Sequence, residues 1–473
     1  MNTDRFKDYQ KDVKDLVLGF EAMQNRGESC YYDVDEIETI IDFYLETADG
    51  EMLEKSVRYA ESLFPTSNEI RLRRVHLLCF KERYEEAHAI LKKLERIEPE
   101  NTDIQYALGV VYGALEQHRK AIRYYLKAAM DGYELGIIYS NIADEYTHLN
   151  QYHEARNYYR KALKINYNDE RALYSLAECY EEEGATDKCV HYFINFVEEH
   201  PYSKVGWYCL GEGYLQESLY EKAIDAYEYA LAIDSSFFNA YLQLSLCHFL
   251  SEDYDSAVNT LHDALKYTDD KADIYFRIAE IFKVRNNFVT ANVYYRKAVQ
   301  EDPYYGDAWM SMALCYSLTG QHTAAIDAIG RAIKSSPESP TYLTTLAVIY
   351  GDSGDDESAE KFFSYVTSMF AEFDNGWLAY ADFLILRKRY DDAINLLSDG
   401  LPECDDTFGF NVRLAYCYFI TGRRNSLYNA VRACLYEDNE GGKILLDYCP
   451  EMANDIEVMN IINSYRQESD TQE

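Results

Sequence analysis

The chain has 473 residues, 48% of them apolar, and its 82 acidic side chains against 46 basic ones give a formal net charge of −36. The apolar share supplies a sizeable core, which excludes a disordered chain. The negative charge repels phosphate backbones and anionic lipid headgroups, which excludes a general nucleic-acid or membrane-surface role.

The stretch 1–33 predicts a capping helix. Its opening segment, MNTDRFKDYQKDVKD at 1–15, is charged and lacks the apolar core of a secretory signal. An apolar stripe at helical spacing follows, made of Phe6, Val13, Leu16, Val17, Phe20 and Met23. The longest apolar run of the chain, LAYCYFI at 414–420, is far shorter than the roughly twenty residues that a membrane span needs. We therefore expect a soluble, cytoplasmic protein.

From position 34 onward the sequence repeats itself with a period of about 34 residues. The stretches YHEARNYYRKALKIN at 152–166, YEKAIDAYEYALAID at 220–234 and FVTANVYYRKAVQED at 288–302 lie two periods apart, and weaker copies lie between them. The only three tryptophans, Trp207, Trp309 and Trp377, are also separated by whole multiples of this period. Internal repetition at this length indicates stacked helical units rather than separate domains.

Twelve repeats fit residues 34–441, with starts at 34, 68, 102, 136, 170, 204, 238, 272, 306, 340, 374 and 408. Position 8 of the repeat is Gly, Ala or Ser in ten of them and position 20 is Ala in nine, which lets two helices approach closely. Position 15 is Gly or Asn in six repeats, and both residues tolerate the left-handed conformation that ends a helix: Asn150, Gly184, Asn286, Gly320, Gly354 and Gly422. The pattern predicts two antiparallel helices in each repeat.

Residues 442–473 predict a C-terminal capping helix and a disordered tail that begins at Gln467. The apolar stripe of the cap consists of Ile456, Met459, Ile461, Ile462 and Tyr465.

The repeat at 204–237 carries a recognisable set of residues: Trp207, Leu210, Gly211, Tyr214, Ala223, Tyr227 and Ala230. This set resembles the tetratricopeptide repeat (TPR) pattern, with Tyr in place of Phe and Ser235 where a proline would stand. The first and last repeats depart from the pattern, with Ile41, Leu53 and Leu427 at the small positions. The resemblance implies an all-α fold, a right-handed superhelical solenoid of helix-turn-helix repeats. It also implies that the first helices line a concave groove that holds a peptide or protein segment of a partner.

The sequence has no motif of a known catalytic, nucleotide-binding or metal site. Only about 65 residues lie outside the repeats, too few for a separate catalytic domain. The acidic stretch GDSGDDESAE at 351–360 falls at the turn between two helices, where negative charge favours a helix N-terminus, so calcium binding is not expected there. We therefore expect no enzyme activity, no cofactor and no metal.

The predicted groove is lined by positions 2, 5, 6, 9, 12 and 13 of each repeat. Position 9 is acidic in six of the twelve repeats, about twice what the composition would give: Asp42, Asp144, Glu178, Glu212, Glu280 and Asp382. Glu181 and Glu182 extend this acidic line, and aromatic residues stand beside it at position 5. The predicted peptide-binding residues are Tyr106, Asn141, Asp144, Tyr174, Glu178, Glu182, Tyr208, Glu212, Leu242, Phe276 and Glu280.

Two interpretations of this groove stay open. In one, its acidic and aromatic side chains select a basic segment of a protein partner, with an apolar pocket next to it. In the other, the acids are the solvated face of an acidic protein. Two further classes of function remain beside these: a structural or oligomerising scaffold that uses its convex face or its ends, and an enzyme without a recognisable motif. The pattern leaves the oligomeric state open.

Overall fold

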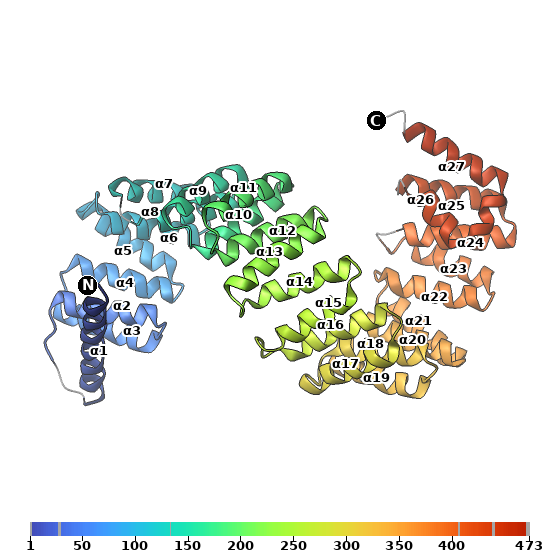
Figure 1. The fold of residues 1–473 in the computed structure, drawn as a ribbon, viewed down its shortest axis with the longest axis horizontal. Helices are drawn as coiled ribbons and strands as arrows, with labels where there is room; N and C mark the ends of the chain where they lie inside the picture. The colour runs from blue at the N-terminus through green and yellow to red at the C-terminus, as the bar shows by residue number, and fades with distance from the viewer. Residues whose placement is uncertain (1, 27–29, 133, 405–406, 438–439, 470–473) are drawn as a thin grey trace. The chain divides into compact units, whose positions relative to one another are not determined.

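The structure is a computed structural model that describes residues 2–26, 30–132, 134–404, 407–437 and 440–469. Within these ranges the chain is all α-helical and has no strand, as the sequence predicts. The chain divides into two compact bodies, an N-terminal body from Met1 to Cys247 and a C-terminal body from His248 to Glu473, and each is described by itself. Figure 1 labels the helices of both.

The helices of the N-terminal body follow one another without a long interruption. They are α1 (Asn2–Arg26), α2 (Val34–Glu46), α3 (Gly50–Leu63), α4 (Asn68–Phe80), α5 (Tyr84–Ile97), α6 (Thr102–Ala114), α7 (His118–Ala128), the 3-10 helix η1 (Ala129–Asp131), α8 (Leu135–His148), α9 (Tyr152–Ile165), α10 (Glu170–Glu182), α11 (Thr186–Glu199), α12 (Lys204–Gln216) and α13 (Tyr220–Ile233). The next helix, α14 (Phe238–Leu250), has residues in both bodies.

The C-terminal body continues in the same manner. Its helices are α15 (Tyr254–Ala264), α16 (Lys271–Val284), α17 (Phe288–Glu301), α18 (Gly306–Leu318), α19 (His322–Ser335), α20 (Pro340–Ser353), α21 (Asp356–Met369), α22 (Asp374–Leu386), α23 (Tyr390–Gly400), α24 (Phe408–Thr421), α25 (Arg424–Glu437), α26 (Gly441–Tyr448), the 3-10 helix η2 (Pro450–Asn454) and α27 (Ile456–Ser469). Where the sequence predicts one capping helix after 441, the structure has three helical segments. Of the predicted disordered tail, residues 467–469 belong to α27, and 470–473 lie outside the described residues.

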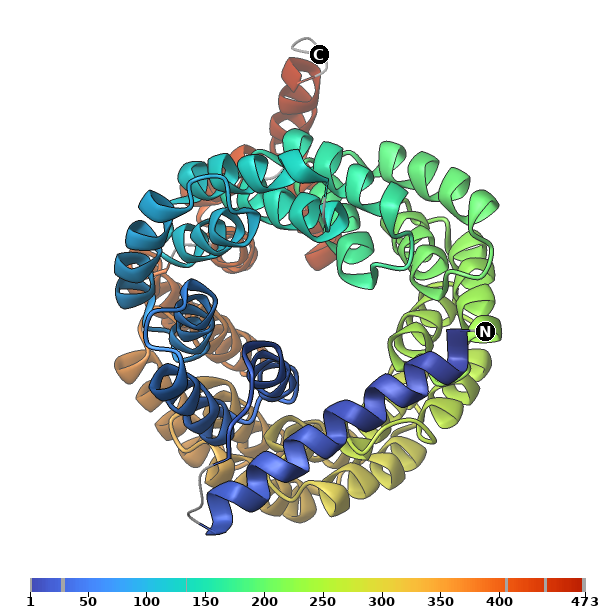
Figure 2. The same cartoon turned by 90° about the vertical axis from the view of Figure 1, so that its left-hand side faces the viewer.

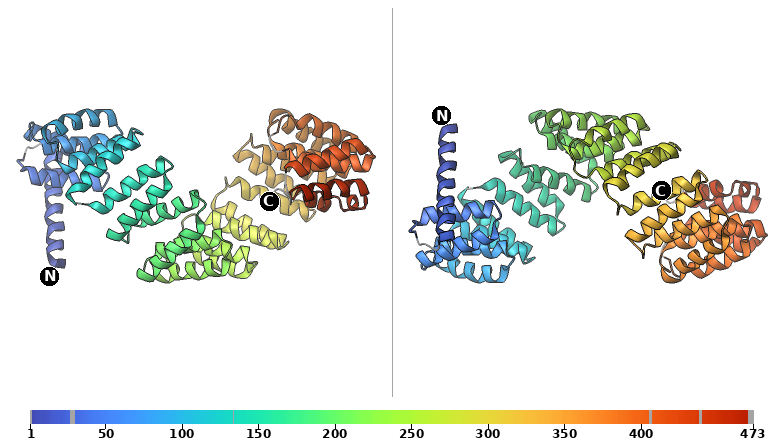
Figure 3. Two further views of the ribbon diagram at one scale, coloured as in Figure 1. Left: turned by 90° about the horizontal axis from the view of Figure 1, so that it is seen from above. Right: turned by 90° about the horizontal axis from the view of Figure 1, so that it is seen from below.

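The helices from α2 to α25 alternate between two roles. Each even-numbered helix begins within one residue of a predicted repeat start, and each odd-numbered helix begins after the turn that follows it. Within each body, most helices pack against their neighbours in the sequence (Figure 3). Several first helices of successive repeats also contact one another, for example α10 with α12 and α20 with α22. The count of twelve repeats stays a prediction of the sequence.

Small side chains at positions 8 and 20 bring the two helices of a repeat together. Ala87 and Ala223, both at position 20, are fully buried. At position 8, a Cβ added to Gly211 would lie 2.6 Å from a ring carbon of Tyr227, a large buried side chain of the second helix. The tyrosine ring thus fills the space that the missing side chain leaves, as close packing requires.

The turn between the two helices has the same backbone conformation in all twelve predicted repeats. The six Gly and Asn residues at position 15 have φ between 55° and 85°, which confirms the predicted left-handed helix ends. The same conformation, with φ between 56° and 63°, occurs at position 15 of the other six repeats, in Ala48, Glu82, Glu116, Ser218, Glu252 and Lys388. Their residue types do not favour a left-handed conformation, so the sequence did not predict it at these six positions.

The tryptophans tie a helix to the turn that precedes it. The indole Nε1 of Trp207 donates to the carbonyl oxygen of Pro201 at 2.9 Å, and Trp309 does the same to Pro303 at 3.0 Å. Trp377 donates to the carbonyl oxygen of Ala371 at 2.8 Å. In each case the indole N–H of the tryptophan meets a backbone carbonyl six residues earlier, which explains why the three tryptophans occupy the same position of the repeat.

Helices outside the repeats cover both ends of the chain. In Figure 2, α1 is the long dark blue helix that begins at the label N. The ring of Phe20 on α1 is fully buried between Tyr44 of α2 and Tyr59 of α3, with centroids 6.3 and 5.9 Å away. At the other end, Ile462 of α27 is fully buried, as the predicted stripe requires, whereas Ile456 is 77% exposed. The side chain of Phe6 lies outside the described residues.

Candidate functional site

Three of the six acids at position 9 accept a hydrogen bond from a buried tyrosine of the same repeat. The Tyr159 hydroxyl donates to Asp144 Oδ1 at 2.6 Å, and the Tyr227 hydroxyl donates to Glu212 Oε1 at 2.6 Å. The side chains of Tyr295 and Glu280 form the third pair. In each case the tyrosine lies 15 residues after the acid, so position 24 of the second helix reaches position 9 of the first.

Two further acids at position 9 pair with an arginine at position 6 of the next repeat. Arg73 Nη2 donates to Asp42 Oδ2 at 3.0 Å in the N-terminal body. Arg413 Nη2 donates to Asp382 Oδ2 at 2.7 Å in the C-terminal body. These acids therefore hold successive first helices together, which is a structural role.

Glu178 is the sixth acid, and it has neither kind of partner. Position 24 of its repeat is Phe193, which has no hydroxyl group, and position 6 of the next repeat is Cys209. Glu178 is exposed on α10, and no hydrogen bond or ion pair reaches its carboxylate from the residues that the structure describes. Its charge is therefore free to meet a ligand.

A pocket of about 400 Å³ opens beside Glu178 between α10 and α12. We call it the acidic pocket. Three carboxylates line it, those of Glu178, Glu181 and Glu212, and no lysine or arginine is among its described lining residues. The rings of Tyr174 and Tyr208 form an aromatic wall and meet edge to face with centroids 5.7 Å apart. The pocket brings together four of the predicted groove residues: Tyr174, Glu178, Tyr208 and Glu212.

Burial raises the pKa of the Glu212 carboxyl, against the opposing effect of hydrogen bonds from Tyr227 and Tyr208. The negative charge of Glu181 raises this pKa further. Ionisation of Glu212 in the folded protein is thus less favourable than in water, and the hydrogen bonds from its tyrosine partners only partly offset this difference in free energy. A cation in the pocket would lower that cost, and the electron-rich faces of the two wall tyrosines would also attract it.

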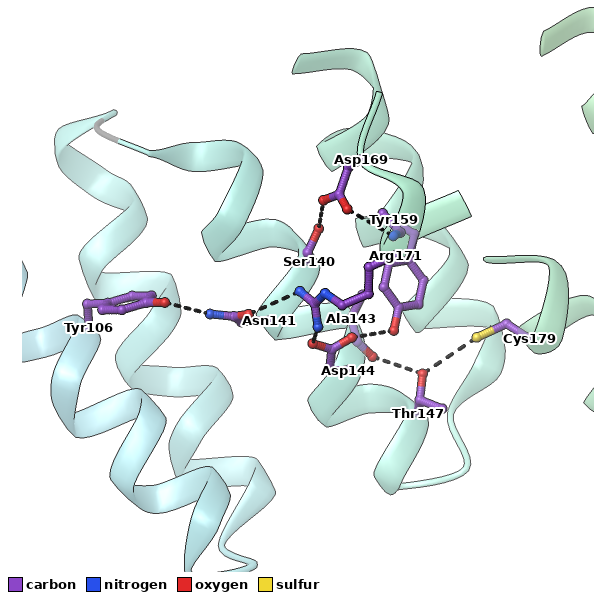
Figure 4. A network of polar contacts seen from close by, with 11 residues as sticks. Tyr106, Ser140, Asn141, Ala143, Asp144, Thr147, Tyr159, Asp169, Arg171 and Cys179 are labelled. Carbon is purple, nitrogen blue, oxygen red and sulfur yellow. Dashed lines mark hydrogen bonds and ion pairs between the residues drawn. The ribbon is translucent and has the colours of Figure 1, made fainter. Parts of the chain in front are cut away.

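A network of polar contacts beside the acidic pocket engages other predicted residues (Figure 4). Asn141 Nδ2 donates to the Tyr106 hydroxyl at 3.0 Å, and Arg171 Nη2 donates to Asn141 Oδ1 at 3.4 Å. Arg171 also pairs with Asp144, which accepts from Tyr159. Because Tyr106, Asn141 and Asp144 already have partners, a ligand would have to compete with these internal contacts.

The remaining predicted residues do not join the acidic pocket. Glu182 is exposed and accepts a hydrogen bond from the Tyr152 hydroxyl at 3.4 Å, and Leu242 is half-buried on α14. Phe276 packs against Tyr305 in the C-terminal body, with centroids 5.0 Å apart. Glu280 of the same body pairs with Lys283 as well as with Tyr295.

A second acidic cavity, of about 710 Å³, lies on α2, α4 and α6 of the same body as the acidic pocket, and sequence reasoning missed it. Six carboxylates line it against Arg73 and His76: Glu38, Asp42, Glu69, Glu98, Asp103 and Glu134. Burial raises the pKa of Glu38 and Asp42, although Arg73 opposes the shift. Acids at positions 2 and 5, counted together with position 9, would have revealed it.

In the described part of the chain, no three His, Cys, Asp or Glu side chains come together in a way that could hold a metal ion. Among the same residues, no helix combines the length and the apolar character that a bilayer crossing requires.

Comparisons with known families match several stretches of the chain. Models described as tetratricopeptide repeat match residues 102–130 and 137–169, 171–203, and 285–349. These stretches agree with the helix pairs and helix ends described above. The chain is a tetratricopeptide repeat protein. TPR proteins are in general scaffolds for protein interaction, and the chain shares this general role.

Relatives of this TPR protein differ in how much of their length they share with it. It is 21% identical over 392 residues to the TPR repeat-containing protein YpiA of Bacillus subtilis, which covers 82% of this chain and 81% of that protein. It is 25% identical over 136 residues to the general transcriptional corepressor ssn6 of Schizosaccharomyces pombe, a match to 28% of this chain but only 12% of the corepressor. Among solved structures, the APC/C hetero-tetramer Cut9–Hcn1 contains a chain with 14% identity and a TM-score of 0.37, covering 86% of this chain and 94% of that one.

Proposed function

We propose that the N-terminal body binds a basic segment of a protein partner along its first helices, with a lysine or arginine of that segment in the acidic pocket. The observation that carries this proposal is the pocket itself. Glu178, Glu181 and Glu212 line one cavity, and its described lining supplies no cation to balance them. A charge without an internal partner is available to an external one.

The pocket suits a cationic side chain for three physical reasons. A cation relieves the repulsion between Glu181 and Glu212 that helps to raise the pKa of Glu212. The faces of Tyr174 and Tyr208 add cation–π attraction, about 0.5–2 kcal/mol according to how far the cation is desolvated. The long apolar stem of a lysine or arginine also fits a cavity whose wall is aromatic.

The second acidic cavity supports an extended ligand rather than a single cation. It lies on first helices of the same body and holds six carboxylates, which Arg73 balances only in part. A partner segment with basic side chains spread along it would satisfy both cavities. Such binding should weaken as the salt concentration rises, because exposed charges are screened over about 10 Å at about 0.1 M salt.

The test is a charge-reversed variant, Glu178→Lys with Glu181→Lys, used as bait in a native lysate. Glu212 is left intact because its carboxylate accepts the Tyr227 hydrogen bond, and its loss would disturb the packing of the repeat. Quantitative mass spectrometry compares the proteins captured by the wild type and by the variant. We expect at least one partner to be lost from the variant, while circular dichroism shows an unchanged helical signal.

The matched control is Glu221→Lys with Glu228→Lys, which makes the same change in net charge. Both residues are exposed on α13, a second helix, and neither lines the acidic pocket. The control should retain the partner. If the wild type, the variant and the control capture the same proteins in the same amounts, the proposal is wrong.

A further inference from the structure

A cavity of about 770 Å³ in the N-terminal body lies on second helices rather than first helices. We call it the basic pocket. It lies between α9 and α11, and Arg160, Lys164 and Lys188 line it. Three cations around one cavity run against the composition of the chain, in which acids outnumber bases by 82 to 46.

None of these three cations forms an ion pair within the described residues. Lys164 and Lys188 are exposed and take part in no ion pair there. The Arg160 guanidinium lies over the rings of Tyr180 and Tyr192, 5.7 and 5.0 Å from their centroids, and donates to the Tyr180 hydroxyl. Its Nε is buried and has no hydrogen-bond partner among the same residues. Aromatic rings hold the arginine in place without cancelling its charge.

The two acids of the basic pocket do not reverse its sign. Asp187 stands in the first turn of α11 and Glu199 ends the same helix, and neither pairs with a described cation. The imidazole of His200 stacks on the ring of Tyr167 with centroids 4.2 Å apart. Leaving aside the two histidines of the lining, three cations face two carboxylates, so the pocket is locally positive on a strongly negative protein.

An apolar floor lies under the cations. Leu163 of α9 and Phe196 of α11 are 3% and 7% exposed, and both line the cavity. The volume is in the range of roughly 300–1,000 Å³ that is typical of ligand pockets. A cavity between two neighbouring helices, with an apolar floor and a charged rim, suits a short amphipathic segment better than a lone ion.

We propose that the basic pocket binds a short acidic segment of a protein partner. Carboxylates of the segment meet Lys164, Lys188 and Arg160, and one apolar side chain rests on Leu163 and Phe196. A short segment is favoured over a long polyanion because the attraction is local. Exposed charges act mainly within a screening length of about 10 Å. An extended nucleic acid therefore gains at the pocket, but its remaining phosphates lie against the acidic surface of a chain with a net charge of −36.

The experiment is a peptide display library of random short segments, selected on the full-length protein. The variant Lys164→Glu with Lys188→Glu is compared with the wild type and with the control Lys93→Glu plus Lys222→Glu. The control changes the net charge equally at exposed lysines that do not line the pocket. We expect the wild type and the control to enrich acidic peptides that carry an aromatic or aliphatic residue.

The enriched acidic peptides are then labelled, and their affinity for each protein is measured by fluorescence anisotropy. Because like charges placed opposite each other are strongly unfavourable, we expect the charge-reversed variant to lose about tenfold or more in affinity. The neutral variant Lys164→Gln with Lys188→Gln should show a smaller loss in the same direction. It keeps the test decisive if the charge-reversed protein folds poorly.

Three results would overturn the proposal. The selection could enrich no acidic peptides, or the enriched peptides could bind the variants as tightly as the wild type. A single-stranded RNA oligonucleotide could also bind with the same dependence on Lys164 and Lys188 while acidic peptides do not. Basic peptides recovered in the same selection report on the acidic pocket, so the two proposals can fail independently.

Discussion

Removal of one hydroxyl group, in Tyr227→Phe, tests whether the acids at position 9 are structural acceptors. The Tyr227 side chain is fully buried, and its hydroxyl donates to Glu212 Oε1 at 2.6 Å. Phenylalanine keeps the ring and therefore opens no large cavity. The half-buried carboxylate loses one donor, and a hydrogen bond to a charged group contributes about 1.5–3 kcal/mol. We expect the repeat at 204–237 to lose roughly 2 kcal/mol of local stability.

Amide hydrogen exchange read by mass spectrometry is the suitable assay, because repeat proteins open locally. A loss of about 2 kcal/mol corresponds to roughly thirtyfold faster exchange, since each step of about 1.4 kcal/mol is a factor of ten. The faster exchange should be confined to α12, α13 and the helices that contact them. Tyr202→Phe is the control because Tyr202 is 86% exposed. Exchange in Tyr227→Phe within about twofold of the wild type would refute the reasoning.

The remaining predictions concern the acidic pocket. The folded-state pKa of Glu212 is raised above its unfolded value, so the body loses stability as the pH rises through the window just above the ordinary glutamate range. In the same window, ionisation of Glu212 strengthens the binding of a basic segment. Affinity measured by calorimetry should therefore fall as the pH is lowered through this window, and less steeply in Glu212→Gln. Phe193→Tyr would place a hydroxyl 15 residues after Glu178, the spacing of the three tyrosine–acid pairs. We expect this variant to bind the captured partner more weakly than the wild type, and an unchanged affinity would contradict the assignment of Glu178 as the free acid.

The fold could be predicted because the repeat period appears at positions where helix packing restricts the size of the side chain. At Gly109 and Gly211, an added Cβ would lie within 3.0 Å of a tyrosine ring of the second helix, so a larger residue does not fit without a shift. Ala87 and Ala223 are fully buried where the two helices of their repeats pack. The turns were predictable only in part. Ala48, Glu82 and Lys388 have φ near 60° although such residues rarely adopt it, at a cost of about 1–2 kcal/mol each. The packing of the two helices imposes that conformation, whatever the residue.

The acidic character of the candidate site could be predicted from position 9, but the state of each acid could not be read from that position alone. Whether an acid is free depends on position 24 of its own repeat and on position 6 of the next. Tyr227 and Arg73 carry this information in the sequence, and a search for such pairs would have found them. The basic pocket left no comparable signal, because its cations belong to two repeats and only the fold brings them around one cavity.

The three tyrosine–acid pairs lie in alternate repeats, those that start at 136, 204 and 272. The two repeats between them show which residue stands at position 9 when no tyrosine faces it. The pairs lie at Asp144, Glu212 and Glu280, each two repeat periods from the next. In the intervening repeats, position 24 is Phe193 or Leu261, and position 9 is Glu178 or Leu246. Both position-9 residues are exposed, one charged and one apolar.

Where position 9 makes no internal hydrogen bond, it can thus carry either a charged or an apolar side chain without a loss of packing. Recognition can vary at such positions, whereas a paired acid such as Asp144 cannot be changed without loss of the contact to Tyr159. The overall excess of acids at position 9 is therefore weak support for a basic partner, because most of these acids hold the repeats together. The support comes from Glu178 and from the lack of a cation in the described lining around it.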